Sequence, residues 1–181
     1  MYSKALKFLL LTALCYLLQA TVPYYIQILD VAPNLALAII AVVTVAMGRK
    51  YTFFMSTIVG YLLEIMMGEL TYMSLILYPV CCMLGAIAFS DKSARKLEEE
   101  RSTGKRTGNL PAHLRTPLCA LLSTGVFEFV NVFYIYLNGV TIDAGHILRA
   151  LLAVVYTAAL AGLLQFPIRW WLGIYKLQKA R

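Results

Sequence analysis

Six long apolar runs, separated by short turns, dominate the sequence. Crossing the roughly 30 Å hydrocarbon core of a bilayer takes about 20 helical residues, with a range of roughly 17 to 25. Proline, glycine and asparagine stand between the runs, where turns are expected. The pattern predicts six transmembrane helices, at Ala5 to Val22, Val31 to Met47, Thr52 to Met67, Tyr72 to Phe89, Thr116 to Leu137 and Gly145 to Phe166.

The long connection between the fourth and fifth runs is polar and divides the membrane domain. Residues 1–89 carry four predicted helices, residues 90–115 form a polar cytoplasmic loop, and residues 116–181 carry two helices and a tail. The loop contains a charged cluster with i,i+4 pairs, typical of a helical extension. This cluster is either a solvated face or the docking site of a cytoplasmic partner; its residues are Arg95, Lys96, Glu98, Glu99, Glu100 and Arg101.

Composition agrees with a membrane location. Hydrophobic residues make up 61% of the chain and charged residues 14%, against an apolar norm of about 45 to 50% for soluble domains. A soluble monomer of this size would expose apolar patches far above the usual few hundred Å². We therefore expect an all-α integral membrane protein built as a bundle of six transmembrane helices.

The distribution of charge predicts the orientation. The net charge is +7, and the basic residues other than Arg149 lie at or near the termini and in alternate connections. The three other loops contain no Lys or Arg and carry Asp30, Glu69 and Asp143 instead. Because cytoplasmic loops are enriched in Lys and Arg, both termini are predicted to be cytoplasmic. This arrangement also argues against nucleic-acid binding, which needs a basic stripe with interleaved aromatic residues.

The first run has a second interpretation, a secretory signal, because Lys4 and Lys7 precede it. No A-x-A-like cleavage site follows Leu18, and five further runs remain. A retained first helix is the better interpretation.

Three charged residues fall well inside predicted spans, namely Glu64, Glu128 and Arg149, whereas Lys7 lies near the start of the first span. A charged side chain at the centre of a transmembrane helix costs about 2.5 to 3.5 kcal/mol on insertion scales. Each of these three residues therefore needs a charged partner, a water-filled cavity or a functional role. One hypothesis pairs Glu64 with Arg149 near the outer surface, with Glu128 and Asn131 adding polar contacts. The alternative is that Arg149 extends to the outer interface and Glu64 forms local hydrogen bonds.

Gly60, Glu64 and Gly68 are spaced by four residues and so share one ridge of the third helix. Glycines at this spacing allow a neighbouring helix to approach closely. The ridge indicates either a close helix crossing around a buried carboxylate or ordinary transmembrane packing.

Patterns that carry chemistry are missing from the sequence. There is no phosphate-binding glycine loop, no metal-ligand spacing and no Ser, Cys and His arrangement on one side of the membrane. The four cysteines lie in apolar runs without a C-x-x-C pair, which favours small core residues. We expect a protein that is not an enzyme and binds no cofactor.

One stretch resembles a known family. Pro33-Asn34-Leu35 opens an apolar span, Gly48-Arg49 marks the inner turn, and Gly60-Tyr61-Leu62-Leu63-Glu64 precedes Gly68. Together with the six spans and the polar loop after the fourth, this stretch from Ala32 to Phe89 resembles the rod shape-determining protein MreD family. The sequence has Glu64 where that family often has Asp, and it lacks a glycine common after that hairpin.

The resemblance implies a non-enzymatic scaffold subunit of the bacterial cell-elongation (rod-shape) complex, in the bacterial plasma membrane, helping to position peptidoglycan synthesis. The implied partners are an MreC-like bitopic membrane protein, an MreB-like actin filament, and a wall-synthesis glycosyltransferase and transpeptidase. The family is also similar in fold to the substrate-binding subunits of energy-coupling-factor vitamin transporters. Such a subunit is the alternative function, although the short outer loops argue against a capped pocket.

Overall fold

The computed structural model describes residues 2–28, 31–67, 72–89 and 111–173. Within these ranges the chain is all-α and forms six helices, as the apolar pattern predicts. They are α1 (Tyr2–Thr21), α2 (Leu35–Met47), α3 (Arg49–Met67), α4 (Met73–Phe89), α6 (Ala112–Leu137) and α7 (Ala144–Leu172). The part of the fold prediction that concerns helix number and approximate position is confirmed.

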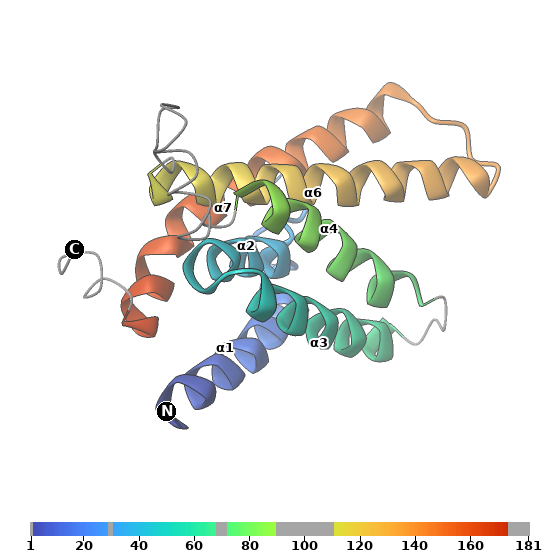
Figure 1. The fold of residues 1–181 in the computed structure, drawn as a ribbon. Helices are drawn as coiled ribbons and strands as arrows, with labels where there is room; N and C mark the ends of the chain where they lie inside the picture. The colour runs from blue at the N-terminus through green and yellow to red at the C-terminus, as the bar shows by residue number, and fades with distance from the viewer. Residues whose placement is uncertain (1, 29–30, 68–71, 90–110, 174–181) are drawn as a thin grey trace, which may run out of the picture.

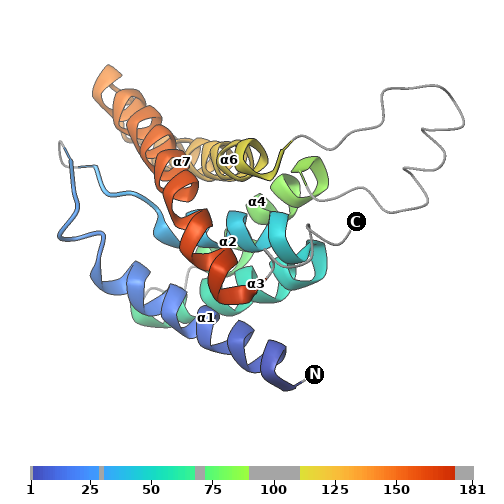
Figure 2. The same ribbon diagram turned by 90° about the vertical axis from the view of Figure 1, so that its left-hand side faces the viewer.

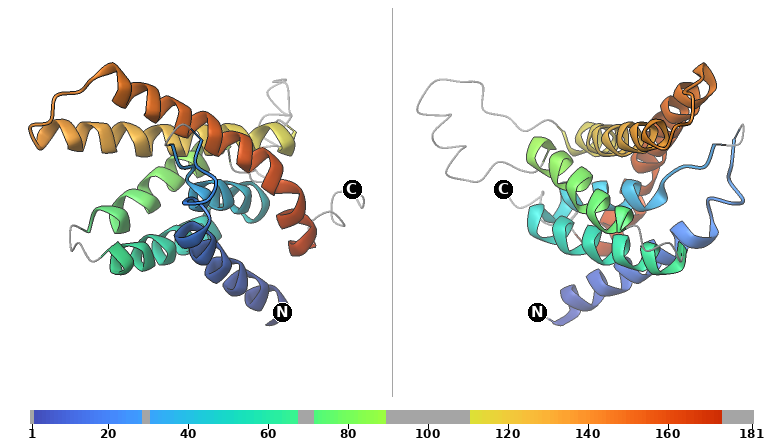
Figure 3. Two further views of the ribbon diagram at one scale, coloured as in Figure 1. Left: turned by 180° about the vertical axis from the view of Figure 1, so that it is seen from behind. Right: turned by 90° about the vertical axis from the view of Figure 1, so that its right-hand side faces the viewer.

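The helices pack around α2. Figure 1 shows α3 and α4 as one hairpin, α6 and α7 as a longer hairpin across the other side, and α2 between them. The views in Figures 2 and 3 keep α2 in this central position, with α1 on the flank of the α3–α4 pair. Every residue of α2 from Leu35 to Val45 is buried. The apolar core therefore sits along α2.

Helix α2 starts later than predicted because a proline and a capping residue precede it. The expected helix began at Val31, but the observed one begins at Leu35. Pro33 disfavours helical backbone in the residue before it. Asn34 then serves as the N-cap, and its side chain accepts a hydrogen bond from the Leu37 N–H.

The last two helices extend beyond their predicted bounds, and each contains a proline. Helix α6 begins at Ala112 with Pro117 inside it, and α7 extends beyond Phe166 through Pro167 to Leu172. A proline removes one internal hydrogen bond and tends to kink a helix without necessarily ending it. Figure 1 shows α7 changing direction in its C-terminal part. The true end is Gly173, whose φ of 70° suits glycine.

Two of the helices meet the length and apolarity expected of a membrane span, namely His113–Leu137 and Ala144–Leu172. In each, only 22% of the apolar window is buried within the protein. Both helices are therefore long and apolar enough to cross a membrane and keep most of their apolar window on the surface. The apolar helices Ala5–Thr21, Leu35–Met47 and Met73–Phe89 are shorter.

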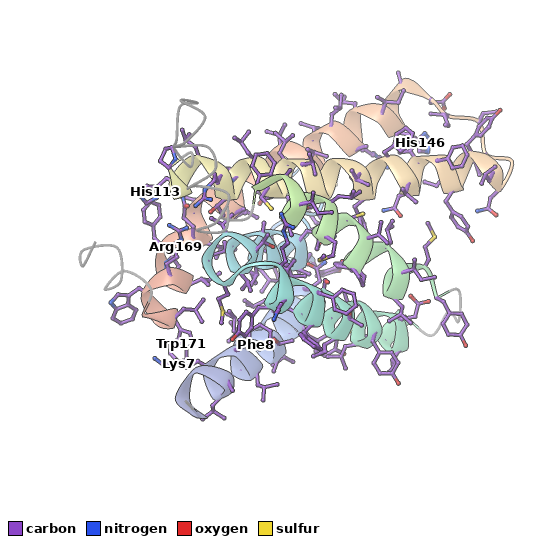
Figure 4. All side chains as sticks on the ribbon, viewed as in Figure 1. Lys7, Phe8, His113, His146, Arg169 and Trp171 are labelled. Atoms are coloured by element: carbon purple, nitrogen blue, oxygen red, sulfur yellow. The ribbon has the colours of Figure 1, made fainter. Side chains whose placement is uncertain are left out.

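The starts of α1 and α6 and the end of α7 gather at one end of the bundle. Lys7 of α1 donates a hydrogen bond to the Trp171 carbonyl near the end of α7, with a distance of 3.3 Å between Nζ and O. The ring of His113 at the start of α6 stacks on Phe166 of α7, with centroids 5.5 Å apart. The labelled residues of Figure 4 show Lys7, His113, Arg169 and Trp171 on the same side of the molecule, with His146 at the other end.

Candidate functional site

The start of α2 is a polar cluster that ties four helices together. Asn34 donates its backbone N–H to Thr157 Oγ1 of α7 at 3.0 Å. Its side-chain amide donates to the Tyr78 hydroxyl of α4 at 3.0 Å. From α1, Gln19 Oε1 accepts the Ala36 N–H at 2.9 Å. Because these partners occupy the free N–H groups at the helix start, α2 can begin inside the bundle without water.

The crossing of α3 and α4 forms a second polar contact beside the first. A Cβ at Gly60 would lie 2.8 Å from the Ser74 carbonyl oxygen and 3.3 Å from Tyr78 Cβ. One turn further along α3, Glu64 is buried, and its Oε2 accepts the Ser74 N–H at 2.9 Å. Ser74 lies in the first turn of α4, where a carboxylate is favoured by the helix dipole. Of the two interpretations of this ridge, the structure supports a close crossing around a buried carboxylate.

A small pocket joins the two contacts. It has a volume of about 240 Å³. One wall is a pair of aromatic rings, Tyr78 and Phe127, in an edge-to-face arrangement with centroids 5.1 Å apart. The lining comes from α1, α3, α4 and α6, through Gln19, Ala20, Leu63, Met66, Ser74, Tyr78 and Phe127. Most of this surface is apolar, with a few polar groups at fixed positions.

Glu128 and Asn131 lie one turn apart on α6. Both are partly buried. Glu128 follows Phe127 and is close enough to the Tyr78 hydroxyl to interact with it electrostatically. Within the part of the chain that the structure describes, Glu128 forms no hydrogen bond or ion pair. Its carboxyl group is thus a partly buried acid without a counter-charge among the described residues.

Arg149 lies away from Glu64. Helix α3 packs mainly on α4, α2 and α1, whereas α7 packs mainly on α6 and α2. Arg149 is exposed on α7, and Glu64 is bonded to the start of α4. This arrangement corresponds to the alternative in which Glu64 bonds locally and Arg149 extends outward.

The remaining predicted site residues fall outside the described residues. These are Gly68 and the charged loop cluster Arg95, Lys96, Glu98, Glu99, Glu100 and Arg101. The proposed docking role of that cluster stays a prediction.

Sequence reasoning missed several residues of the cluster. Asn34 carried a signal, because an Asn just before an apolar run is a typical N-cap. Gln19, Tyr78 and Thr157 carried none, since their roles depend on partners from other helices. Gly85 was missed too, although a Cβ there would overlap Ser123 Oγ and approach Cys119 Sγ, so it marks a close crossing of α4 and α6.

The described residues contain no group of three or more His, Cys, Asp or Glu able to hold a metal ion. The four cysteines are free and buried. What the cluster offers chemically is hydrogen bonding between helices, beside an apolar pocket with a carboxylate at its edge.

Comparisons with protein-family models, with curated proteins and with solved structures found no match for this chain.

Proposed function

We propose that this chain is a multi-pass membrane scaffold, a non-enzymatic subunit of the bacterial cell-elongation complex of the MreD type. In this proposal all six helices cross the bacterial plasma membrane, with both chain ends in the cytoplasm. Its lipid-facing surfaces hold an MreC-like bitopic protein and the wall-synthesis glycosyltransferase and transpeptidase, and its cytoplasmic side faces an MreB-like filament.

The observation that carries the proposal is the use of polar residues to join helices. Asn34, Tyr78, Thr157 and Gln19 bond one helix to another, and Glu64 fixes the start of α4 against α3. Such fully satisfied polar networks rigidify a core. A rigid bundle with an apolar exterior suits a protein whose task is to position partner helices.

The residues behind the family resemblance have architectural roles that fit this task. Pro33 is buried, Asn34 caps the central helix, and Gly60 and Glu64 make the α3–α4 crossing. The substitution of Glu for the family's common Asp retains a carboxylate for the Ser74 N–H. These observations support the resemblance without establishing the partners.

The alternative is a substrate-binding subunit of an energy-coupling-factor vitamin transporter, which the pocket between α1, α3, α4 and α6 favours. Its volume of about 240 Å³ is below the roughly 300 to 1,000 Å³ typical of pockets for drug-sized ligands. A vitamin would therefore need the helices to separate. The small volume favours the scaffold.

Purification in mild detergent after cross-linking in cells tests the choice. The scaffold predicts recovery of a bitopic coiled-coil protein and of wall-synthesis enzymes, in amounts that fall for Gly60→Leu and persist for the control Gly125→Ala. Recovery of an ATPase module with a bound vitamin, without the wall enzymes, contradicts the scaffold and supports the alternative.

A further inference from the structure

Two acidic residues are neighbours of residues that line the small pocket: Glu64 bonds Ser74, and Glu128 interacts electrostatically with Tyr78. Leu63 and Ser74 both line the pocket. Leu63 directly precedes Glu64 in the sequence, and the Ser74 N–H donates a hydrogen bond to Glu64. Phe127, on the other wall, directly precedes Glu128. Glu64 is engaged with the start of α4, whereas Glu128 forms no hydrogen bond or ion pair with the described residues.

The described lining contains no charged side chain, so none of its members balances Glu128 when that carboxyl group is ionised. Its polar members are Gln19, Ser74 and Tyr78, all neutral side chains, and the rest are apolar. In the low dielectric of a helix bundle, an unbalanced carboxylate interacts with a nearby charge far more strongly than it would in water. The pocket therefore favours a positive charge and disfavours an anion.

The aromatic wall strengthens this preference and sets the size of the occupant. Tyr78 and Phe127 are in edge-to-face contact, and the face of such a ring attracts a cation. A cavity of about 150 Å³ holds benzene. The volume of about 240 Å³ suits one ring with a short charged arm.

We propose that this pocket binds a cationic group attached to a ring-sized apolar body, with Glu128 as the counter-charge. The site goes beyond the scaffold function, which requires no ligand. The same chemistry has two sources, a free organic amine or a basic side chain of a membrane partner. Either source places its cation near Glu128 and its apolar part against Leu63 and Phe127.

Two small probes test the proposal on the purified full chain in detergent. Phenethylammonium and the neutral 2-phenylethanol have nearly the same shape, and their affinities are measured from the shift in thermal unfolding with concentration. We expect phenethylammonium to bind about tenfold more tightly or better, as a charge-assisted contact implies. Equal affinity of the two probes for the unaltered protein overturns the proposal without requiring any variant.

Variants then assign the preference to one residue. In Glu128→Gln, the protein should bind phenethylammonium and 2-phenylethanol with similar affinity. In Glu128→Asp, it should still bind phenethylammonium more tightly than 2-phenylethanol. Phe129→Leu is the matched control, because Phe129 is the next residue and is 72% exposed. A preference for the cation that survives unchanged in Glu128→Gln contradicts the assignment of the counter-charge.

Two further measurements distinguish the sources. Mass spectrometry of solvent extracts of the purified protein should detect an organic amine if the occupant is a free molecule. A photo-cross-linking amino acid in place of Met66, which lines the pocket and is 57% exposed, should instead attach to a Lys- or Arg-containing peptide of a partner. The probe test needs no partner protein. The binding site and the scaffold function can therefore be confirmed or contradicted independently of each other.

Discussion

At the scale of single residues, the polar side chains near the pocket fall into two groups. Asn34, Gln19 and Glu64 accept N–H groups at the starts of helices. An N–H group left without a partner in an apolar environment costs several kcal/mol, so these side chains are structural. Glu128 has no comparable role among the described residues, which makes it the residue with a function still to be assigned.

Gly60 offers the sharpest test of close packing. The change Gly60→Ala places a Cβ 2.8 Å from the backbone oxygen of Ser74, so the two helices must move apart. We expect a loss of about 1 to 3 kcal/mol in the free energy of unfolding, typical of overpacking. Denaturation in detergent, followed by circular dichroism, measures this loss.

The matched control is Gly125→Ala. A Cβ at Gly125 has no heavy atom within 4 Å, and replacing a mid-helix glycine by alanine is favourable by roughly 0.5 to 1 kcal/mol. Equal stability of the two variants would show that α3 and α4 do not approach closely at Gly60.

At the scale of elements, α2 is the unusual helix. Its 13 residues span about 20 Å, less than the roughly 30 Å hydrocarbon core. Because α2 is buried from Leu35 to Val45, its ends need partners from other helices and not from lipid headgroups. The cluster at Asn34 supplies these partners at the start of the helix.

A double-mutant cycle tests this role. Asn34→Ala removes the cap of α2 and the contact with Tyr78, and Tyr78→Phe removes only the hydroxyl. Each should lower stability by about 0.5 to 2 kcal/mol, as the loss of a cap or a hydrogen bond does. Because the two residues share a hydrogen bond, the combined loss should fall short of the sum by about 0.5 kcal/mol or more.

Asn138→Ala serves as the control for that cycle. Asn138 is an exposed residue after α6, and its amide bonds only the nearby Tyr134 carbonyl. Strict additivity of Asn34→Ala with Tyr78→Phe would contradict the cluster.

The elements were predictable because each is a continuous apolar run. The runs located all six described helices, while their ends shifted at particular residues. The chain remains helical through Pro117 and Pro167, because neighbouring helices can compensate for a lost hydrogen bond in a bundle.

The site was only partly predictable. The spacing of Gly60 and Glu64 on one ridge identified a close crossing around a carboxylate, which the structure contains. The sequence pattern did not identify Ser74 as the hydrogen-bond partner of Glu64. It also did not predict the hydrogen bond between Asn34 and Thr157, which lies 123 positions later in the chain. Contacts between distant helices depend on how the helices pack, and a single sequence does not encode that in any short pattern.

At the scale of the whole molecule, the starts of α1 and α6 and the end of α7 lie at one end of the bundle. The contacts of Lys7 with Trp171 and of His113 with Phe166 both lie there. The cations Arg49 and Arg169 belong to the same end, at the start of α3 and near the end of α7. This is the end that the proposed topology places in the cytoplasm.

Cysteine labelling in intact cells tests the central claim most directly. Single cysteines at Ser102 and Thr141 are treated with a membrane-impermeant maleimide; the four native cysteines are buried and are expected to react poorly. Six crossings with cytoplasmic ends predict labelling of Thr141→Cys in intact cells, and of Ser102→Cys only after the cells are opened. Labelling of Ser102→Cys in intact cells, or protection of Thr141→Cys, would contradict the account.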